Sequence, residues 1–231
     1  MVRFITLAGK KQTGKDTSAE FIKQLLTTDN RDLGERYVGK PGPRFEPHQI
    51  HITHFADALK KACNVIFGVP LEYMETEEGK QKLTHVRWPT DYGNYIEPTL
   101  KSDNYQLWRP DDTGQPMTVR EVLQFVGTEL FRNQIDPDVW LNSVFLQPWQ
   151  DDDIVIIADA RFPNEAALGR ESGLLIKVER DTGLISDGHK SENALDDFTD
   201  YHYTVNNNGS FEELKMHLEA ILVQRRFIIN A

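Results

Sequence analysis

The stretch GKKQTGKDT at residues 9–17 decides the expected fold. It has the spacing of a Walker A phosphate-binding loop, in which a glycine is followed by four residues and then by Gly-Lys. Residues 3–8 have the pattern of a short strand, and a helical pattern with an apolar face runs over residues 14–28. Such a loop turns tightly at its glycines, so that its N–H groups and the following helix N-terminus hold phosphate oxygens. We therefore expect a strand, a phosphate-binding loop and a helix in succession.

This loop is expected to bind the phosphates of ATP. The candidate ATP-binding residues all lie in it: Gly9, Lys11, Thr13, Gly14, Lys15, Asp16 and Thr17. Lys15 has the place of the lysine that reaches the β and γ phosphates, which makes it a candidate catalytic residue. A Ser or Thr that binds Mg²⁺ normally follows this lysine, and here the residue is Asp16. A carboxylate is also a hard oxygen ligand, so Asp16 and Thr17 are both candidate Mg²⁺ ligands. The alternative, a glycine turn that caps a helix and binds nothing, is disfavoured by the strand before it and the helix after it.

Strand and helix patterns alternate along the rest of the chain. Further strands are expected at 51–55, 154–158, 174–178 and 201–205, and helices at 57–67, 119–130, from about 137 and after Ser210. The run Ile154–Ala158 is apolar throughout, as in a strand that is buried on both faces of a parallel sheet. Ser210 and Glu213 have the spacing of a capping box. The sequence predicts an α/β P-loop kinase fold with three layers, in which helices flank a mostly parallel five-stranded sheet.

Two stretches lack this periodicity. Residues 29–48 contain Asp, Asn, Gly and three Pro and are expected to form a loop. Residues 68–117 contain scattered Pro, Gly, Tyr and Trp. A loop of that length inside a compact domain is usually a functional insertion, a lid or a mobile segment. We therefore expect one domain over residues 1–231, with an insertion or lid-like segment around 68–117.

Charged residues follow the buried run at 154–158. Asp159 comes where a P-loop fold places a Mg²⁺-associated carboxylate, and where ligands collect in open parallel sheets. It is expected to orient Mg²⁺-bound water or a substrate group; alternatively it caps the helix that begins near Pro163. Arg161 is a candidate phosphate contact, because the guanidinium group is planar and always charged. Arg120 and Arg132, at the two ends of one expected helix, are further candidates for the acceptor phosphate.

Other residue types carry less information. Trp140 either stacks on a base or packs in the core. Cys63 is the single cysteine and is expected to be a small buried residue. The histidines at 48, 51, 54 and 85 lack the spacing of a metal site and are expected to be solvated or to pack.

The composition limits the class of partner. The chain has 231 residues and a formal net charge of -10, and no basic face is evident, so binding to duplex nucleic acid is disfavoured. The apolar runs are too short to cross a bilayer, and no signal peptide is recognised. A cytoplasmic location is expected.

Four blocks in this order resemble the phage-type deoxynucleoside monophosphate kinases. They are residues 7–22 with the unusual Asp16; the block from Val119-Arg120 to Gly127-Thr128-Glu129-Leu130, with Trp140 downstream; Asp159-Ala160-Arg161 with Asn164-Glu165; and His189, Ser191-Glu192 and Asn206 with residues 209–214. Residues 29–48 and 68–117 are not covered by the resemblance. The Gly-Lys-Asp-Thr form together with the Gly-Thr-Glu block is more specific to these kinases than the phosphate-binding loop alone.

The resemblance implies transfer of the ATP γ-phosphate to the 5′-phosphate of a deoxynucleoside monophosphate, with Mg²⁺ as the cofactor of ATP. The residues that it implies on the monophosphate side are Gly127, Thr128, Arg132, Trp140, Asp159, Arg161 and Glu165, and Arg120 joins them as a candidate from its charge. The expected catalytic set is Lys15, Arg132, Asp159 and Arg161. The resemblance also implies a bacteriophage enzyme in the host cytoplasm, and a homodimer.

Three alternatives remain at this point. One is another small-molecule P-loop kinase, such as one acting on phosphomevalonate or dephospho-coenzyme A. The second is a module that binds ATP and transfers no phosphate. The third is a nucleic-acid-dependent ATPase motor, which the acidic balance disfavours.

Overall fold

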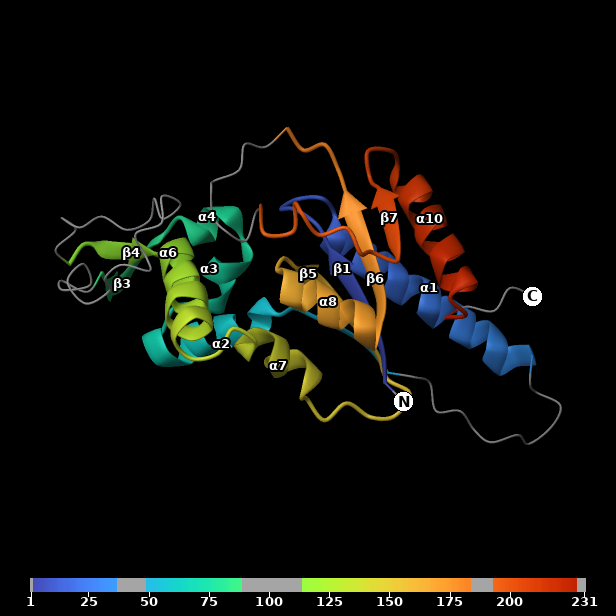
Figure 1. Cartoon of the computed structure of the whole chain (residues 1–231), viewed down its shortest axis with the longest axis horizontal. Helices are drawn as coiled ribbons and strands as arrows, with labels where there is room; N and C mark the ends of the chain where they lie inside the picture. Colours follow the sequence, from blue (N-terminus) through green and yellow to red (C-terminus); the bar gives the residue numbers. More distant parts are fainter. Residues whose placement is uncertain (1, 37–48, 89–113, 184–192, 228–231) are drawn as a thin grey trace. The chain divides into compact units, whose positions relative to one another are not determined.

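The computed structural model describes residues 2–36, 49–88, 114–183 and 193–227 (Figure 1). Their contacts divide them into two compact units. The first unit contains the described residues up to His54 and from Gln147 onward, and the second contains those of Phe55–Leu146. The expectation of one domain with a lid-like segment stays a prediction, and residues 89–113 of that segment lie outside the described residues.

A five-stranded sheet forms the centre of the first unit. Its strands are β1 (Arg3–Ala8), β2 (Ile50–Thr53), β5 (Ile154–Ala160), β6 (Gly173–Glu179) and β7 (Tyr203–Asn206). Their order is β2-β5-β1-β6-β7, and every neighbouring pair is parallel. On the central strand, Ile5 lies opposite Ile156 on one side and Leu174 on the other. The expected parallel sheet is confirmed.

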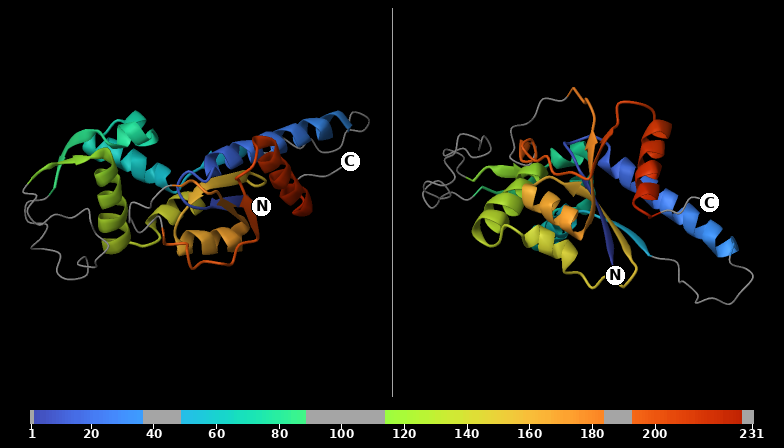
Figure 2. Two further views of the ribbon diagram at one scale, coloured as in Figure 1. Left: turned by 90° about the horizontal axis from the view of Figure 1, so that it is seen from above. Right: turned by 45° about the vertical axis from the view of Figure 1, so that its right-hand side comes forward.

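Helices cover both faces of this sheet. They are α1 (Lys15–Arg36), α8 (Pro163–Ser172) and α10 (Phe211–Gln224). Figure 2 shows α1 and α10 on one face and α8 on the other. The three-layer arrangement is therefore confirmed. Ser210 and Glu213 form the predicted capping box at the start of α10.

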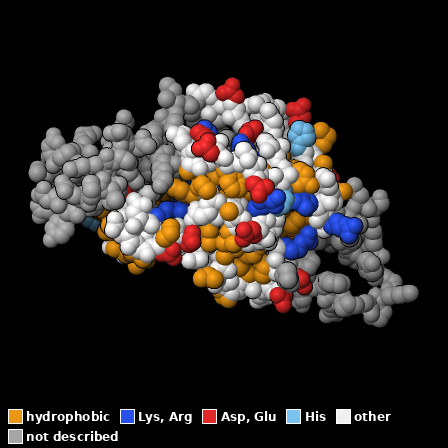
Figure 3. All heavy atoms as spheres, in the orientation of Figure 1, with side chains coloured by type: hydrophobic (Ala, Val, Ile, Leu, Met, Phe, Trp, Pro, Cys, Tyr) orange, Lys and Arg blue, Asp and Glu red, His pale blue; other side chains and the backbone are white. Residues whose placement is uncertain are grey.

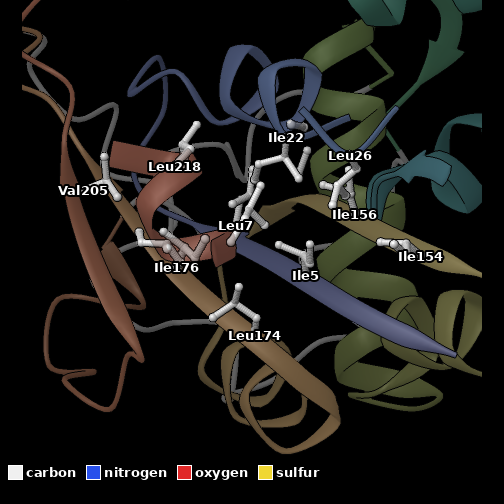
Figure 4. Packing of buried hydrophobic residues seen from close by; sticks show 14 of the residues in the cluster. Ile5, Leu7, Ile22, Leu26, Ile154, Ile156, Leu174, Ile176, Val205 and Leu218 are labelled. Atoms are coloured by element: carbon white, nitrogen blue, oxygen red, sulfur yellow. The ribbon is translucent and has the colours of Figure 1, made fainter. Parts of the chain in front are cut away.

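The core of the first unit lies between the sheet and α1 with α10 (Figure 4). Ile5 and Leu7 of β1 are fully buried there against Ile22 of α1 and Leu218 of α10. Burial of each such side chain stabilises the fold by roughly 1.5–3 kcal/mol. This packing fixes β1 and α1, and with them the loop that joins the two elements.

The second unit is mainly helical. Its helices are α2 (Ala56–Phe67), α3 (Leu71–Glu75), α4 (Glu77–Lys80), α6 (Val119–Gln124), the π-helix η1 (Phe125–Arg132) and α7 (Val139–Phe145). Strands β3 (Leu83–Arg87) and β4 (Pro116–Thr118) form an antiparallel pair. A separate core contains Cys63, Met74, Met117 and Val122. Cys63 is fully buried, as expected.

Some predicted boundaries were wrong. Helix α1 runs to Arg36, although residues 29–36 were expected in a loop. Charged residues are compatible with a helix, and one glycine within it costs only about 1 kcal/mol. Parts of 68–117 form regular elements, namely α3, α4, β3 and β4. The apolar stripe after Val119 continues from an α-helix into a π-helix, and α7 begins at Val139, two residues after Pro137.

Charged side chains of both signs share the surface. On the face drawn in Figure 3, the described Lys and Arg side chains lie among Asp and Glu side chains. This face therefore lacks the broad basic area that duplex nucleic acid would need. Within the described residues, no helix is both long and apolar enough to span a membrane.

Candidate active site

The loop between β1 and α1 has the backbone that its glycines predict. Gly9 has a φ of 151° and Gly14 a φ of 96°, which are conformations that favour glycine. Neighbouring atoms also leave no room for a side chain. A Cβ atom on Gly9 would collide with the carbonyl of Val178, and one on Gly14 would collide with the side chain of Asn207. Both glycines are therefore required by strain and by packing.

Lys15 lies inside this loop. Its ammonium group donates hydrogen bonds to the carbonyls of Gly9, at 2.8 Å, and Lys10, at 2.6 Å. The residue is only 6% exposed. Thr13 also donates from its hydroxyl to the Lys10 carbonyl, at 3.0 Å. The loop thus holds a largely buried cation beside the N-terminus of α1, where helix dipole and N–H groups also favour an anion.

Asp16 and Thr17 follow this lysine in the first turn of α1. The carboxylate of Asp16 is 84% exposed and lies 3.0 Å from Nε2 of His54, just after β2. The contact gives His54 an acidic partner, which the sequence reasoning missed. Carboxylate and hydroxyl oxygens are ligands that suit Mg²⁺, so the donors at these two positions fit this ion.

The described residues contain no group of three or more His, Cys, Asp or Glu that could hold a metal ion. Phosphate-transferring enzymes usually bind Mg²⁺ through one or two protein groups together with water and substrate phosphates. One or two oxygen donors are sufficient at such a site.

Asp159 and Arg161 lie at the carboxyl end of β5. Because Ala8 of β1 is opposite Ala160, these residues reach the same edge of the sheet as the phosphate-binding loop. Glu165 is 2% exposed, and its Oε2 accepts from the backbone N–H of Arg161, at 2.8 Å, and of Phe162, at 3.1 Å. Glu165 therefore caps α8 and fixes the backbone from which the Arg161 side chain projects.

A pocket of about 390 Å³ adjoins the phosphate-binding loop in the first unit. It is lined by Gly9, Lys10, Thr13 and Arg161, by residues 177–181 after and within β6, and by Leu195, Asp196, Tyr201, Asn206 and Asn208. The ion pair between Lys10 and Asp196, at 2.8 Å, lies in its wall. Burial, aided by the charges of Glu179 and Asp196, raises the pKa of Tyr201 to about 12. The phenol is therefore a neutral hydrogen-bond donor near neutral pH.

The candidate arginines of the second unit contact protein groups. Arg120 forms an ion pair with Glu77, with 2.6 Å between Nη2 and Oε2. Nη1 of Arg132 donates to the carbonyl of Pro137 at 3.3 Å. Neither contact prevents a phosphate contact, because each guanidinium group has five N–H donors.

Gly127, Thr128 and Trp140 are buried in the second unit. The indole N–H of Trp140 donates to the carbonyl of Gly127 at 2.9 Å, and the residue is 6% exposed. The ring centroid of Trp140 lies 5.1 Å from that of Phe131. A Cβ atom on Gly127 would approach Leu59 of α2 to 2.7 Å, so this glycine permits close packing of η1 on α2. These contacts favour packing over base stacking for Trp140.

The structure divides the candidates between its two units. The first holds the loop residues, Asp159, Arg161 and Glu165; the second holds Arg120, Gly127, Thr128, Arg132 and Trp140. The sequence reasoning missed Lys10, a loop residue that forms an ion pair with Asp196, and Asn207, which donates to the loop at Thr13. The run of three asparagines at the end of the last strand is a signal for Asn207, because the turn that follows the strand lies at the ligand-binding edge of the sheet.

The phosphate-binding loop follows the central strand of this parallel sheet, and Asp159 lies at the end of the neighbouring strand β5. This arrangement defines a nucleotide-binding protein of the P-loop kinase class. The family model described as deoxynucleotide monophosphate kinase matches residues 60–218. The chain belongs to the deoxynucleotide monophosphate kinase family. The resemblance seen in its motifs is confirmed.

Two viral relatives agree with this membership. The chain is 31% identical to a protein of Acanthamoeba polyphaga mimivirus that is named as a deoxynucleotide monophosphate kinase, with 90% of each chain covered. It is 27% identical to the deoxynucleoside-5′-monophosphate kinase of Escherichia phage T5, with 93% of each chain covered.

Proposed function

We propose that this enzyme transfers the γ-phosphate of ATP to the 5′-phosphate of a deoxynucleoside monophosphate. The observation that carries the proposal is the glycine loop around Lys15, in a chain of the deoxynucleotide monophosphate kinase family. The family match supports this acceptor over phosphomevalonate and dephospho-coenzyme A. It also supports an enzyme over a module that only binds ATP and over a nucleic-acid-dependent motor.

ATP binds with its phosphates on residues 9–17 and its nucleoside part in the adjoining pocket. The proximity of the pocket to Gly9 and Thr13 supports this assignment. Lys15 turns from the loop carbonyls toward the β and γ phosphates. The exchange is favourable because a phosphate carries full negative charge, whereas a carbonyl carries only a dipole.

Asp16 or Thr17 would hold Mg²⁺ beside the phosphates of ATP, and Asp159 is a further candidate that would orient water on the ion. When bound, the ion neutralises charge on the β and γ oxygens. The chain itself neutralises further phosphate charge, because it places cationic groups and N–H donors around the phosphates.

An oxygen of the acceptor phosphate attacks the γ-phosphorus in line, and the bond to the oxygen between the β and γ phosphorus atoms breaks to release ADP. A phosphate monoester has a second pKa of about 6, so the acceptor is largely ionised near neutral pH and needs no strong base. Arg161, with Arg120 or Arg132, holds the acceptor phosphate. Gly127 and Thr128 complete the proposed monophosphate side. Trp140 acts there by holding the carbonyl of Gly127, and Glu165 acts through the backbone of Arg161.

The test is ADP production from ATP and Mg²⁺ with each of the four common deoxynucleoside monophosphates, and each ribose form, added singly. We expect strong stimulation by one or more deoxy forms and weak stimulation by ribose forms. ATP binding without stimulation by any of them would contradict the proposed acceptor. The homodimer and the cytoplasm of a host cell stay predictions, which sedimentation and cell fractionation test.

A further inference from the structure

We propose that Asn207 is a positioning residue for ATP binding, which holds the phosphate-binding loop through the carbonyl of Thr13. The amide Nδ2 of Asn207 donates to this carbonyl at 2.8 Å. Asn207 is 6% exposed, and 194 residues separate it from Thr13 in the chain. The inference rests on the proposed function only in taking ATP as the ligand of the loop.

The bond fixes a peptide group that matters for phosphate binding. The peptide between Thr13 and Gly14 is planar and trans, so its N–H points opposite to its carbonyl. With the carbonyl held by Asn207, the N–H of Gly14 is aimed away from Asn207. Gly14 also lies directly against this amide, since a Cβ atom on Gly14 would collide with Nδ2. The side chain of Asn207 thus sets the direction of the peptide between Thr13 and Gly14, and it also sets how closely the phosphate-binding loop packs on the turn that carries Asn207.

The turn that carries Asn207 is itself rigid. The backbone N–H of Asn207 donates to the carbonyl of Glu179 at 2.7 Å, which ties the turn to the end of β6. Next to it, the N–H of Asn208 donates to Oδ1 of Asn206 at 2.9 Å. Oδ1 of Asn208 accepts from the N–H of Asp181 at 2.8 Å. Three loops at the same edge of the sheet are therefore joined through this turn.

The asparagine amide suits this position for a chemical reason. A neutral N–H₂ group donates to a carbonyl without adding charge beside bound phosphates. An aspartate of the same shape would place an anion against the Thr13 carbonyl and close to the ATP phosphates. The substitution Asn207→Asp therefore removes the donor at almost constant volume, and Asn207→Ala removes it without adding charge.

The experiment compares both variants with the wild type in ATP affinity, measured by calorimetry without an acceptor, and in KM and kcat. We expect Asn207→Ala to raise the Kd and KM for ATP about 10-fold, because a buried hydrogen bond is lost. Asn207→Asp should raise them further. The KM for the monophosphate should change less than about 2-fold, since the bond touches only the loop side.

Asn64→Ala is the matched control. Its Nδ2 donates to the carbonyl of Val69 at 2.9 Å, so it loses the same kind of bond in the second unit. It should lower the melting temperature and leave the ATP constants unchanged. A folded Asn207→Ala protein with wild-type ATP affinity would overturn the proposal, and so would a failure of both Asn207 variants to fold, which would show a purely structural role. If the wild type binds ATP but has no monophosphate-dependent activity, the proposed function is contradicted. The role of Asn207 is then still decided by the dissociation constants for ATP.

Discussion

The ammonium group of Lys15 lies 2.8 Å from the carbonyl oxygen of Gly9, inside the loop that both residues delimit. A cation held there can reach a phosphate on the loop by a change of side-chain rotamer, because the positive φ angles of Gly9 and Gly14 let the backbone turn tightly around it. The position of Lys15 within the loop, and not its charge alone, is the basis of the first prediction.

Replacing Lys15 by Ala should lower kcat/KM by about 100-fold to 1,000-fold, because the variant loses a preorganised group that stabilises charge in the transition state. The fold should persist, since the core of β1 and α1 does not include this side chain. Steady-state ADP production and a thermal melt measure the two effects. Lys215→Ala, at an exposed position on α10, is the control and should behave as wild type. Wild-type turnover in the Lys15 variant would refute the assignment of the loop.

Asp16 and Thr17 can be separated by their dependence on Mg²⁺. If Asp16 binds the ion, Asp16→Asn should raise the Mg²⁺ concentration for half-maximal activity several-fold, since a charged oxygen ligand is lost. Thr17→Val is the parallel change at the neighbouring position. We expect the larger shift from Asp16, because its carboxylate is 84% exposed and carries the charge. A larger shift from Thr17 would assign the ligand to the hydroxyl and leave Asp16 as the partner of His54.

The fold could be predicted where local pattern and tertiary structure agree. The strand before Gly9, the buried run at 154–158 and the capping box of Ser210 with Glu213 each carry their own signal. The extension of α1 to Arg36 was missed because Asp, Asn and Gly favour loops only weakly when a helix is already formed. The π-helix at 125–132 gives no distinct pattern, because its apolar stripe also fits an α-helix.

The candidate site could be predicted only where its residues lie together in the sequence. The glycine loop and the pair Asp159 and Arg161 follow directly from motif and strand end. The contact of Asn207 with Thr13 could not be read locally, because 194 residues separate the two. The resemblance places Glu165 on the monophosphate side, which stays a prediction, but only the structure shows that its buried carboxylate caps a helix next to Arg161.

Trp140→Phe should lower the free energy of unfolding by about 1–3 kcal/mol, because the buried carbonyl of Gly127 loses its donor. The KM for the monophosphate should stay close to that of the wild type, since the indole is buried against Phe131 and Gly127 and Phe keeps most of this packing. Urea unfolding and steady-state kinetics measure the two quantities. Trp149→Phe, at a half-buried position of the first unit, should cost less than about 1 kcal/mol. A stable Trp140→Phe enzyme with a strongly raised KM would instead show that the indole contacts the substrate.

His202 should make the stability fall as the solution becomes acidic. Burial, with the charges of Arg225 and Arg170, lowers the pKa of His202 below its ordinary value of 6.5. Its Nδ1 lies 3.0 Å from the backbone N–H of Leu175, which donates to the unprotonated nitrogen. The unfolded chain therefore takes up a proton at a higher pH than the folded protein. This contribution to stability is present above the unfolded pKa of 6.5 and is lost as the pH falls toward the lower folded pKa.

The test of this pH dependence is urea unfolding of the wild type and of His202→Asn on both sides of the unfolded pKa. Asn offers an oxygen that can accept from Leu175 and cannot be protonated in this range. The variant should therefore lose less stability on acidification than the wild type. His217→Asn, at an exposed position of α10, is the control for a simple change in histidine number and should keep the wild-type slope. Equal slopes for the wild type and His202→Asn would show that His202 does not set the pH dependence, and would assign it to carboxylates protonated in the same range.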